Sequence, residues 1–191
     1  ITPALSETCE ETIFKAIEVA KKSGIKVIFD PNVRFKLIND EDKYKCLLNE
    51  ITRLSDYFLP GMNEAMFLSN KETGTPEKVA EHFINVNKDL TVIIKLGAKG
   101  CYYANEDTSN YVPGFQVEKV IDPVGAGDGF AAGMVSGLLK GMNLKEALEQ
   151  ANLIGSMLVQ TSGDVEGFPF KKDLNNFKKY ISEPARDEVN R

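Results

Sequence analysis

The sequence predicts an α/β fold of three layers, with helices on both faces of a mostly parallel central sheet. Short apolar segments with strand character alternate along the chain with segments of helical periodicity. The strongest of these segments, residues 91–96 (TVIIKL), is β-branched and apolar on both faces, as a buried central strand of a parallel sheet is expected to be. Such alternation predicts right-handed crossover connections between neighbouring strands.

The first helix is expected to begin at Ser6 or Thr8, since Thr8 and Glu11 have the spacing of a capping box. Gly24 follows the last periodic residues and predicts the end of this helix. Before the strongest strand we further expect a strand at 26–30, a helix at about 40–52, a strand at 56–60, and helices that begin at residue 63 and at residues 75–76.

After that strand, the segment 97–100 predicts a turn into a hairpin partner at 101–104. A glycine-rich turn later precedes a long helix of small residues that ends near Lys140, and Asn143 is expected to cap the next helix. The other elements expected here are short strands around 111 and at 117–121, a helix at about 144–160 and a C-terminal helix at 171–181. Residues 1–182 are expected to form part of one domain, followed by a charged tail at 183–191.

Composition excludes several classes of function. The 191 residues are 42% hydrophobic and 27% charged, which is ordinary for a globular protein. A net charge of −5 leaves no basic footprint, so a nucleic-acid partner is not expected. No apolar run approaches the ~18 residues of a membrane-spanning helix, so a membrane partner is not expected either.

Cysteine and histidine usage also point away from metal and triad chemistry. The three cysteines are far apart and lack metal-ligand spacing, which favours reduced thiols in the cytoplasm. His82 is the single histidine, and its helical context predicts an ordinary surface residue. The chain begins without methionine and almost at once with a helix signal, and we therefore expect it to be the interior of a longer chain.

The stretch 122–133 (DPVGAGDGFAAG) contains the residues that most strongly indicate a chemical function. A turn of glycine and alanine that opens a helix lets backbone N–H groups approach an anion closely. Asp128 in the first helical turn would repel a bound anion, but it suits a group that takes a proton from a hydroxyl attacking phosphorus. The alternative is an ordinary helix start, with Asp128 placed favourably for the helix dipole. Neither a dinucleotide-binding GxGxxG nor a Walker pattern is present.

This stretch resembles the C-terminal signature of the ribokinase-like (PfkB) sugar kinases, with Pro123 in place of the usual threonine. The resemblance implies a ribokinase-like fold in which Asp128 is the catalytic base. It also implies that the amides of Gly125, Ala126 and Gly127 form the anion hole. Asp122 and the carbonyl of Val124 would then help to hold a monovalent cation such as K⁺.

A second match lies at residues 95–100 (KLGAKG), which resemble the loop that lies against the nucleotide in this family. The resemblance implies ATP-binding roles for Lys95, Gly97 and Gly100, alongside Gly127. From the residues alone, a simple hairpin turn explains the same pattern equally well.

Two further positions extend the resemblance. Glu64 corresponds to the family glutamate that organises Mg²⁺ through water, although Gly61 stands where the motif has asparagine. Asn152 lies in the helix where the family places an asparagine near adenine, and a solvated helical asparagine is the alternative.

The segment 30–34 (DPNVR) resembles fructokinases and 2-keto-3-deoxygluconate kinases, and it implies substrate contacts by Asn32 and Arg34. The planar, always charged guanidinium of Arg34 suits a sugar-acid carboxylate, whereas an internal salt bridge is the alternative. Ile38 occupies a position where this group usually has tryptophan.

Together these matches imply an ATP- and Mg²⁺-dependent kinase that phosphorylates a hydroxyl of a sugar acid, foremost 2-keto-3-deoxygluconate. The alternatives are a fructokinase or ribokinase and, from another class, an inactive fragment or a regulatory remnant that binds sugar or nucleotide. Relative to the family, the N-terminal part and the lid are missing, so we expect activity from the parent protein and not from this fragment alone. The resemblance leaves open a homo-oligomeric parent.

Overall fold

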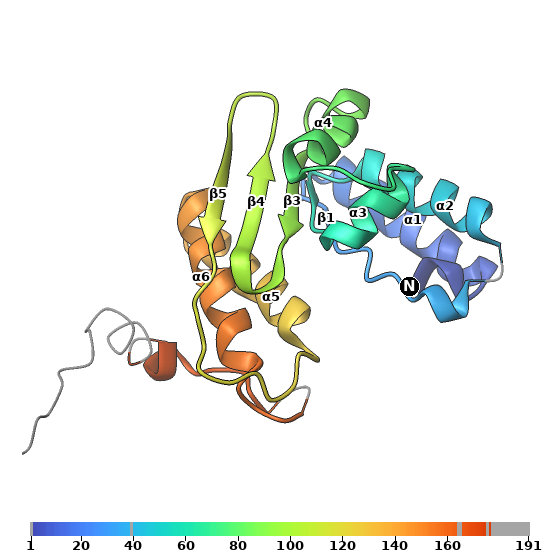
Figure 1. Ribbon diagram of the computed structural model, residues 1–191. Coiled ribbons are helices and arrows are strands. Elements are labelled where there is room, and N and C mark those ends of the chain that lie inside the picture. The colour runs from blue at the N-terminus through green and yellow to red at the C-terminus, as the bar shows by residue number, and fades with distance from the viewer. Residues whose placement is uncertain (1, 39, 164–165, 175, 177–191) are drawn as a thin grey trace, which may run out of the picture. The chain divides into compact units, whose positions relative to one another are not determined.

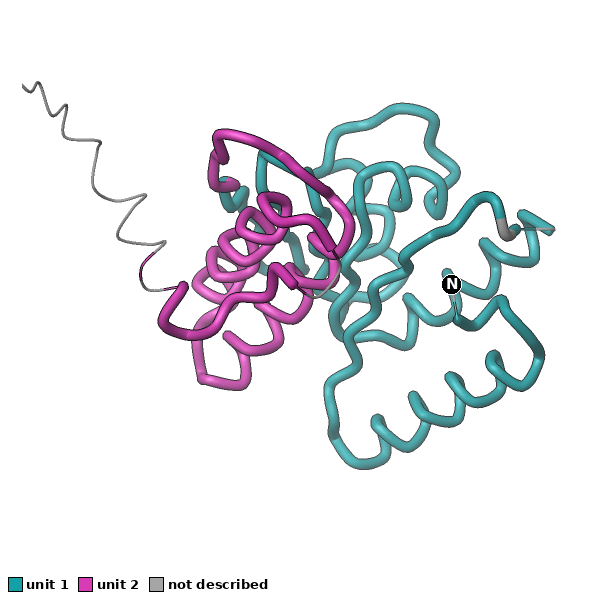
Figure 2. Tube along the Cα trace, turned by 90° about the horizontal axis from the view of Figure 1, so that it is seen from below, with its two compact units in different colours: residues 1–113 teal, residues 114–191 magenta. Residues whose placement is uncertain are grey.

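The computed structural model describes residues 2–38, 40–163, 166–174 and 176. It divides into two compact units, residues 1–113 and 114–191, which Figure 2 shows in different colours. The expected tail at 183–191 lies outside the described residues, and of the expected C-terminal helix only 171–174 and 176 are described, all of them helical.

The first unit contains a five-stranded sheet in the order β1-β2-β3-β4-β5 (Figure 1). β1 pairs in parallel with β2 and β2 with β3, whereas β4 is antiparallel to both of its neighbours. Four of the five strands therefore point the same way, as the sequence predicts. The strands are β1 (Ile28–Phe29), β2 (Tyr57–Phe58), β3 (Thr91–Lys95), β4 (Gly100–Ala104) and β5 (Ser109–Pro113).

Helices follow the strands where the sequence predicts them. Ser6 caps the first helix by accepting a hydrogen bond from the N–H of Cys9, so the expected Thr8–Glu11 capping box is wrong. Asp40 caps the second helix through the N–H of Lys43. The helices of this unit are α1 (Glu7–Lys22), α2 (Glu41–Leu54), α3 (Met62–Leu68) and α4 (Pro76–Val86), with short 3₁₀ turns η1 (Thr2–Ala4), η2 (Phe35–Leu37) and η3 (Gly97–Lys99).

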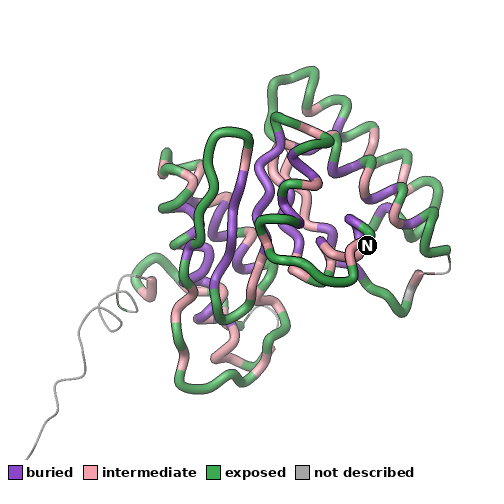
Figure 3. Tube along the Cα trace, turned by 45° about the horizontal axis from the view of Figure 1, so that its top comes forward, coloured by how far each residue is buried: buried purple, intermediate pink, exposed green. Residues whose placement is uncertain are grey.

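The core of the first unit lies on β3 and β4, whose residues are almost all buried (Figure 3). Ile94 on β3 and Phe58 on β2 are fully buried, and they belong to the same apolar cluster as Leu48 of α2 and Val79 of α4. Each fully buried aliphatic or aromatic side chain contributes about 1.5–3 kcal/mol to stability. The central strand expected at 91–96 is confirmed.

The second unit contains the helices α5 (Ala126–Leu139) and α6 (Leu144–Leu158), preceded by the glycine-rich turn. α6 starts with a capping box in which Asn143 and Glu146 exchange hydrogen bonds. A Cβ at Gly133 would lie 2.9 Å from the backbone Cα of Ala151, so glycine is what lets the two helices approach so closely.

The strand expected at 117–121 is wrong, because none of these residues pairs in a sheet. The N–H groups of Ile121 and Asp122 instead donate to the carbonyl of Val159, which follows α6, at 2.7 and 3.2 Å. The segment is thereby fixed to the end of a helix, and its backbone donors are satisfied without a strand partner.

Candidate functional site

The parallel strands β1, β2 and β3 have their carboxyl ends on the same side of the sheet. Most of the candidate residues of the first unit lie at these strand ends. Asp30 follows β1, Gly61 and Glu64 follow β2, and Lys95 ends β3. The N–H of Lys95 donates to the carbonyl of Pro60 at 2.8 Å, which holds the ends of β2 and β3 together. The carboxyl ends of parallel strands are the usual location of ligand sites in such sheets.

The ammonium of Lys95 forms an ion pair with Asp30, with 2.5 Å between Nζ and Oδ2. Both side chains are about one-fifth exposed. The other oxygen, Oδ1, is buried without a hydrogen-bond partner among the described residues. Burial raises the pKa of the Asp30 carboxyl, and the opposing effect of Lys95 does not fully offset it. Lys95 therefore has an internal partner; its contact with a nucleotide stays a prediction.

Glu64 joins the start of α3 to the loop that follows β1. Its Oε2 accepts a hydrogen bond from the N–H of Gly61 at 2.6 Å, and its Oε1 accepts one from the N–H of Val33 at 2.7 Å. Glu64 is half-buried and Val33 is buried. Both oxygens of the carboxylate thus hold the backbone in place.

The same loop carries the two predicted substrate contacts. Asn32 has a φ of +42°, in the left-handed region that costs most residues free energy but that asparagine tolerates better than other non-glycine residues. The Nη1 group of Arg34 donates to the Oδ1 of Asn32. Arg34 is exposed, and within the described residues its guanidinium forms no ion pair with a carboxylate. The alternative of an internal salt bridge is therefore not realised there.

Tyr44 of α2 is a residue of this neighbourhood that the sequence did not indicate. It is 4% exposed, and its hydroxyl has no hydrogen-bond partner in the described part of the chain. Burial and the nearby Glu64 carboxylate raise the pKa of Tyr44, while Arg34 opposes them. Asp30 was missed as a site residue as well, although its place directly after a strand was a usable signal.

The glycine-rich turn opens α5 in the second unit. Gly125 is the N-cap with a φ of +78°, a conformation that glycine adopts without strain. Gly125 has no side chain with which to cap this helix end, and the N–H of Ala126 only reaches the carbonyl of Pro123 at 3.4 Å. The first N–H groups of a helix lack intrahelical partners, so those of this turn are available to an anion.

Asp128 occupies the third position of α5 and is exposed. Among the described residues, none forms a hydrogen bond or ion pair with its carboxylate. Asp122 has a structural partner, because its Oδ1 accepts a hydrogen bond from the N–H of Val124 at 3.0 Å. The turn thus places one carboxylate without a partner among the described residues beside the N–H groups that open α5.

The remaining predicted nucleotide contacts lie in well-formed elements. Residues 95–100 make the hairpin between β3 and β4, with the N–H of Leu96 donating to the carbonyl of Gly100 at 2.8 Å. Gly97 and Gly100 both have positive φ, +61° and +94°. Asn152 on α6 is 7% exposed, so it is not the solvated helical residue of the alternative interpretation. Nucleotide contacts by these residues stay predictions.

The predicted metal contact at Glu64 is an indirect one, through water. Within the described ranges there is no cluster of three or more His, Cys, Asp or Glu side chains able to hold a metal ion. The carboxylate of Glu64 keeps lone pairs beyond its two hydrogen bonds, so it fits a magnesium ion held through water. None of the helices described is long and apolar enough to cross a membrane.

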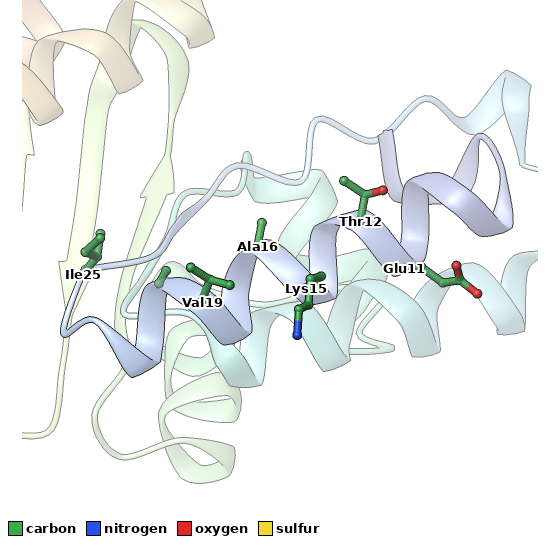
Figure 4. A pocket seen from close by; sticks show the side chains of 7 residues that line it. Glu11, Thr12, Lys15, Ala16, Val19 and Ile25 are labelled. Carbon is green, nitrogen blue, oxygen red and sulfur yellow. The ribbon is translucent and has the colours of Figure 1, made fainter.

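Two hollows in the first unit contain none of the predicted site residues. An open groove follows α1 and is lined by Val19, Ile25, Lys15 and neighbouring residues (Figure 4). A smaller hollow lies between α2 and α4 and is lined in part by His82, which is half-buried. Burial lowers the pKa of His82, with Lys71 contributing in the same direction.

Known proteins resemble this chain over most of its length. The chain is 36% identical over 177 residues to the 2-dehydro-3-deoxygluconokinase of Bacillus subtilis, covering 93% of this chain and 54% of that protein. A PfkB protein from Polaromonas sp. JS666 has a TM-score of 0.76 at 36% identity, over 91% of this chain and 54% of its own. The fructokinase of Vibrio cholerae O395, in fructose, ADP and calcium ion bound form, has a TM-score of 0.83 at 26% identity, over 92% and 58%.

The chain thus spans about half the length of the relatives that it matches. Its structural neighbours include ribokinases, so its fold is ribokinase-like. Residues 3–171 match the family model of pfkB carbohydrate kinases. Since this match covers most of the sequence, the chain belongs to the pfkB family of carbohydrate kinases.

Proposed function

We propose that the intact protein transfers the terminal phosphoryl group of ATP to a hydroxyl of a sugar acid, foremost 2-keto-3-deoxygluconate. The observation that carries this proposal is the exposed carboxylate of Asp128 in the first turn of α5, beside the backbone N–H groups of a helix whose N-cap, Gly125, has no side chain. Membership of the carbohydrate kinase family supports the reaction class. The similarity to a 2-dehydro-3-deoxygluconokinase supports the substrate.

In this mechanism Asp128 accepts the proton of the attacking sugar hydroxyl. A positioned general base contributes about 10²–10⁴ in rate. The N–H groups of Gly125, Ala126 and Gly127 donate to the oxygens of the phosphoryl group as negative charge develops, and each such donor contributes about 10²–10³. Asp122 keeps the turn in shape through its bond to the N–H of Val124.

The nucleotide is proposed to lie against the β3–β4 hairpin at Gly97 and Gly100, with Asn152 near its base. A magnesium ion, when bound, neutralises phosphate charge. Glu64 would accept a hydrogen bond from its water, and Asp122 with the Val124 carbonyl would hold a monovalent cation. The ADP and calcium ion named with the Vibrio cholerae fructokinase support a nucleotide–metal pair in this family.

Arg34 is proposed to bind the carboxylate of the sugar acid. Its guanidinium is exposed and, among the described residues, donates to the neutral Asn32 amide and forms no ion pair, so two or more of its donors remain for a planar bidentate contact. A fructokinase or ribokinase activity is the second candidate, supported by the similarity to the fructokinase. Arg34→Ala separates the two, because it should raise the KM for a sugar acid at least tenfold and the KM for a neutral sugar much less.

The central test is steady-state ATP turnover by the intact protein with 2-keto-3-deoxygluconate, fructose and ribose. Asp128→Asn should lower kcat by about 10²–10⁴ and change the sugar KM little. Asp107→Asn, at another exposed aspartate, is the matched control and should retain wild-type rates. Full activity of the Asp128 variant would refute the base assignment. A wild-type protein that turns over none of the sugars would favour the ligand-binding remnant.

A further inference from the structure

We infer that Glu64 is a positioning residue that sets the affinity for the sugar acid by fixing the loop Asn32–Arg34. This inference rests on the proposed function and adds a specificity role to a residue for which the sequence predicts only contact with metal-bound water. The Glu64 carboxylate accepts two hydrogen bonds from backbone N–H groups, one from Gly61 and one from Val33.

The contact with Gly61 is local, since the two residues are three apart and belong to the first turn of α3. The contact with Val33 is long-range, because 31 positions separate the two residues. An ordinary capping interaction explains the first contact. It does not explain the second, which connects the helix after β2 to the loop after β1.

The long-range contact holds the loop between the two predicted substrate contacts. Val33 is buried, whereas Asn32 before it is half-buried with a φ of +42°, and Arg34 after it is exposed. A left-handed non-glycine residue persists where the surrounding structure determines it. The hydrogen bond from the Val33 N–H to Glu64 lies directly after Asn32. It therefore fixes the backbone that leaves the turn and the position from which the Arg34 side chain extends.

The guanidinium of Arg34 is oriented by its own hydrogen bond to the Oδ1 of Asn32. A guanidinium that is already oriented loses less conformational entropy when it binds a carboxylate. Glu64 therefore acts on substrate binding through Val33 and Asn32, without touching the sugar. This role does not need a metal ion.

Glu64→Gln is the sharpest variant. Glutamine is also accepted in a capping box, so its side-chain oxygen can keep the bond to Gly61, while its amide group faces the N–H of Val33, donor against donor. Glu146→Gln is the matched control, because Glu146 makes the same capping contact at α6 and, within the described part of the chain, no long-range hydrogen bond.

The test measures binding of 2-keto-3-deoxygluconate to the intact protein by isothermal titration calorimetry, in EDTA and without ATP. Glu64→Gln should weaken Kd about tenfold, or about 1.4 kcal/mol, whereas Glu146→Gln should not change it. In an Arg34→Ala background, Glu64→Gln should have no further effect on Kd. An unchanged metal-free Kd, with only the Mg²⁺ dependence of turnover altered, would overturn the inference in favour of a metal role.

Amide hydrogen exchange in the ligand-free protein provides a readout that is independent of the substrate. In Glu64→Gln, the N–H of Val33 should exchange at least tenfold faster, while that of Gly61 stays protected. Unchanged protection of Val33 would overturn the positioning role even if sugar binding were weaker. If the wild-type protein binds no sugar acid, the proposed function and the specificity role fail, and the exchange of Val33 still decides whether Glu64 holds the loop.

Discussion

In the first unit, candidate residues are held by side chains that reach across the fold: Lys95 pairs with Asp30, and Glu64 binds the N–H of Val33. In the second unit, the turn that carries Asp128 is held mainly by its backbone, through the carbonyl of Val159 and the close packing of α5 on α6. Side chains that have internal partners are suited to positioning. The exposed Asp128, which has no such partner among the described residues, is suited to reacting.

The largest effect on stability is expected from breaking the helix packing of the second unit. Gly133→Val should lower the free energy of unfolding by about 2–3 kcal/mol, because its Cβ would meet the backbone of Ala151. Gly129→Ala is the comparison, since its Cβ would meet side chains and not backbone, namely Leu158 Cδ1, which is the nearest atom, and Ile154 Cγ2 at 3.3 Å, and it should cost less than Gly133→Val. Urea unfolding of the intact protein measures both. Equal losses would mean that backbone approach does not hold this unit together.

The next effect is expected at the ion pair of the first unit. Lys95→Met leaves the half-buried Asp30 carboxylate without its cation, which should cost about 1–3 kcal/mol at pH 7. Burial already raises the folded-state pKa of Asp30, and removal of Lys95 raises it further. A group whose pKa is raised by folding contributes stability at low pH, where it is protonated, and loses it as pH rises. The deficit of Lys95→Met in free energy of unfolding should therefore be smallest below about pH 4, the usual pKa range of an aspartate, and grow as pH rises.

The double variant Asp30→Asn/Lys95→Met serves as the control for that experiment. It removes both charges, so most of the pH dependence of the deficit should disappear. A deficit in Lys95→Met that is the same at all pH values would show that Lys95 acts through packing and not through the charge of Asp30.

A smaller effect on stability, with the opposite pH dependence, is expected at Asp56, whose carboxylate binds the backbone before β1. Burial alone would raise the pKa of Asp56, but hydrogen bonds from Lys26 and from the N–H of Val27, both at 2.8 Å, hold it below its usual value. A lowered pKa contributes stability above the unfolded value, about 3.9, which is lost as pH falls through the folded value. Asp56→Asn should cost about 1 kcal/mol at pH 7, and nothing once the wild-type carboxylate is protonated. A cost that persists in acid would contradict this assignment.

The smallest effect is expected at the surface of β5. The Tyr111 hydroxyl donates to Glu77 at 2.7 Å, which raises the pKa of Tyr111 to about 12. Any stabilisation is therefore present below about pH 10 and lost as pH rises through 12. Because the pair is exposed, Tyr111→Phe should leave the urea midpoint unchanged. An NMR titration of Tyr111 near its ordinary value would show that the bond does not persist.

Much of the fold could be predicted because its signals are local. The apolar run 91–96 became β3, Asp40 and Asn143 became helix caps, and the small-residue stretch became α5. The strand at 117–121 failed because a strand depends on a partner, and the Val159 carbonyl took its donors instead. A local pattern cannot reveal a competing acceptor that lies in another part of the chain.

The candidate site was predictable to the same extent. The residues of the glycine-rich turn and of the loop at 30–34 are adjacent in sequence, so their motifs could be recognised. The roles of Lys95 and Glu64 as internal partners could not, because Asp30 lies 65 positions from Lys95 and Val33 lies 31 from Glu64. Tyr44 gave no signal, since a buried hydroxyl without a partner is defined only by its surroundings.

The order of the sheet also has a consequence for folding kinetics. β3, β4 and β5 are joined by short turns, whereas β1, β2 and β3 are separated by whole helices. Hairpins form in about 1–10 μs, and pairings between distant segments are slower because loop entropy is lost first. We therefore expect the ladder from Thr91 to Pro113 to form early and to act as the template on which β2 and then β1 add. Substitutions on β4 should slow folding, whereas those at Ile28 and Phe29 should mainly speed unfolding.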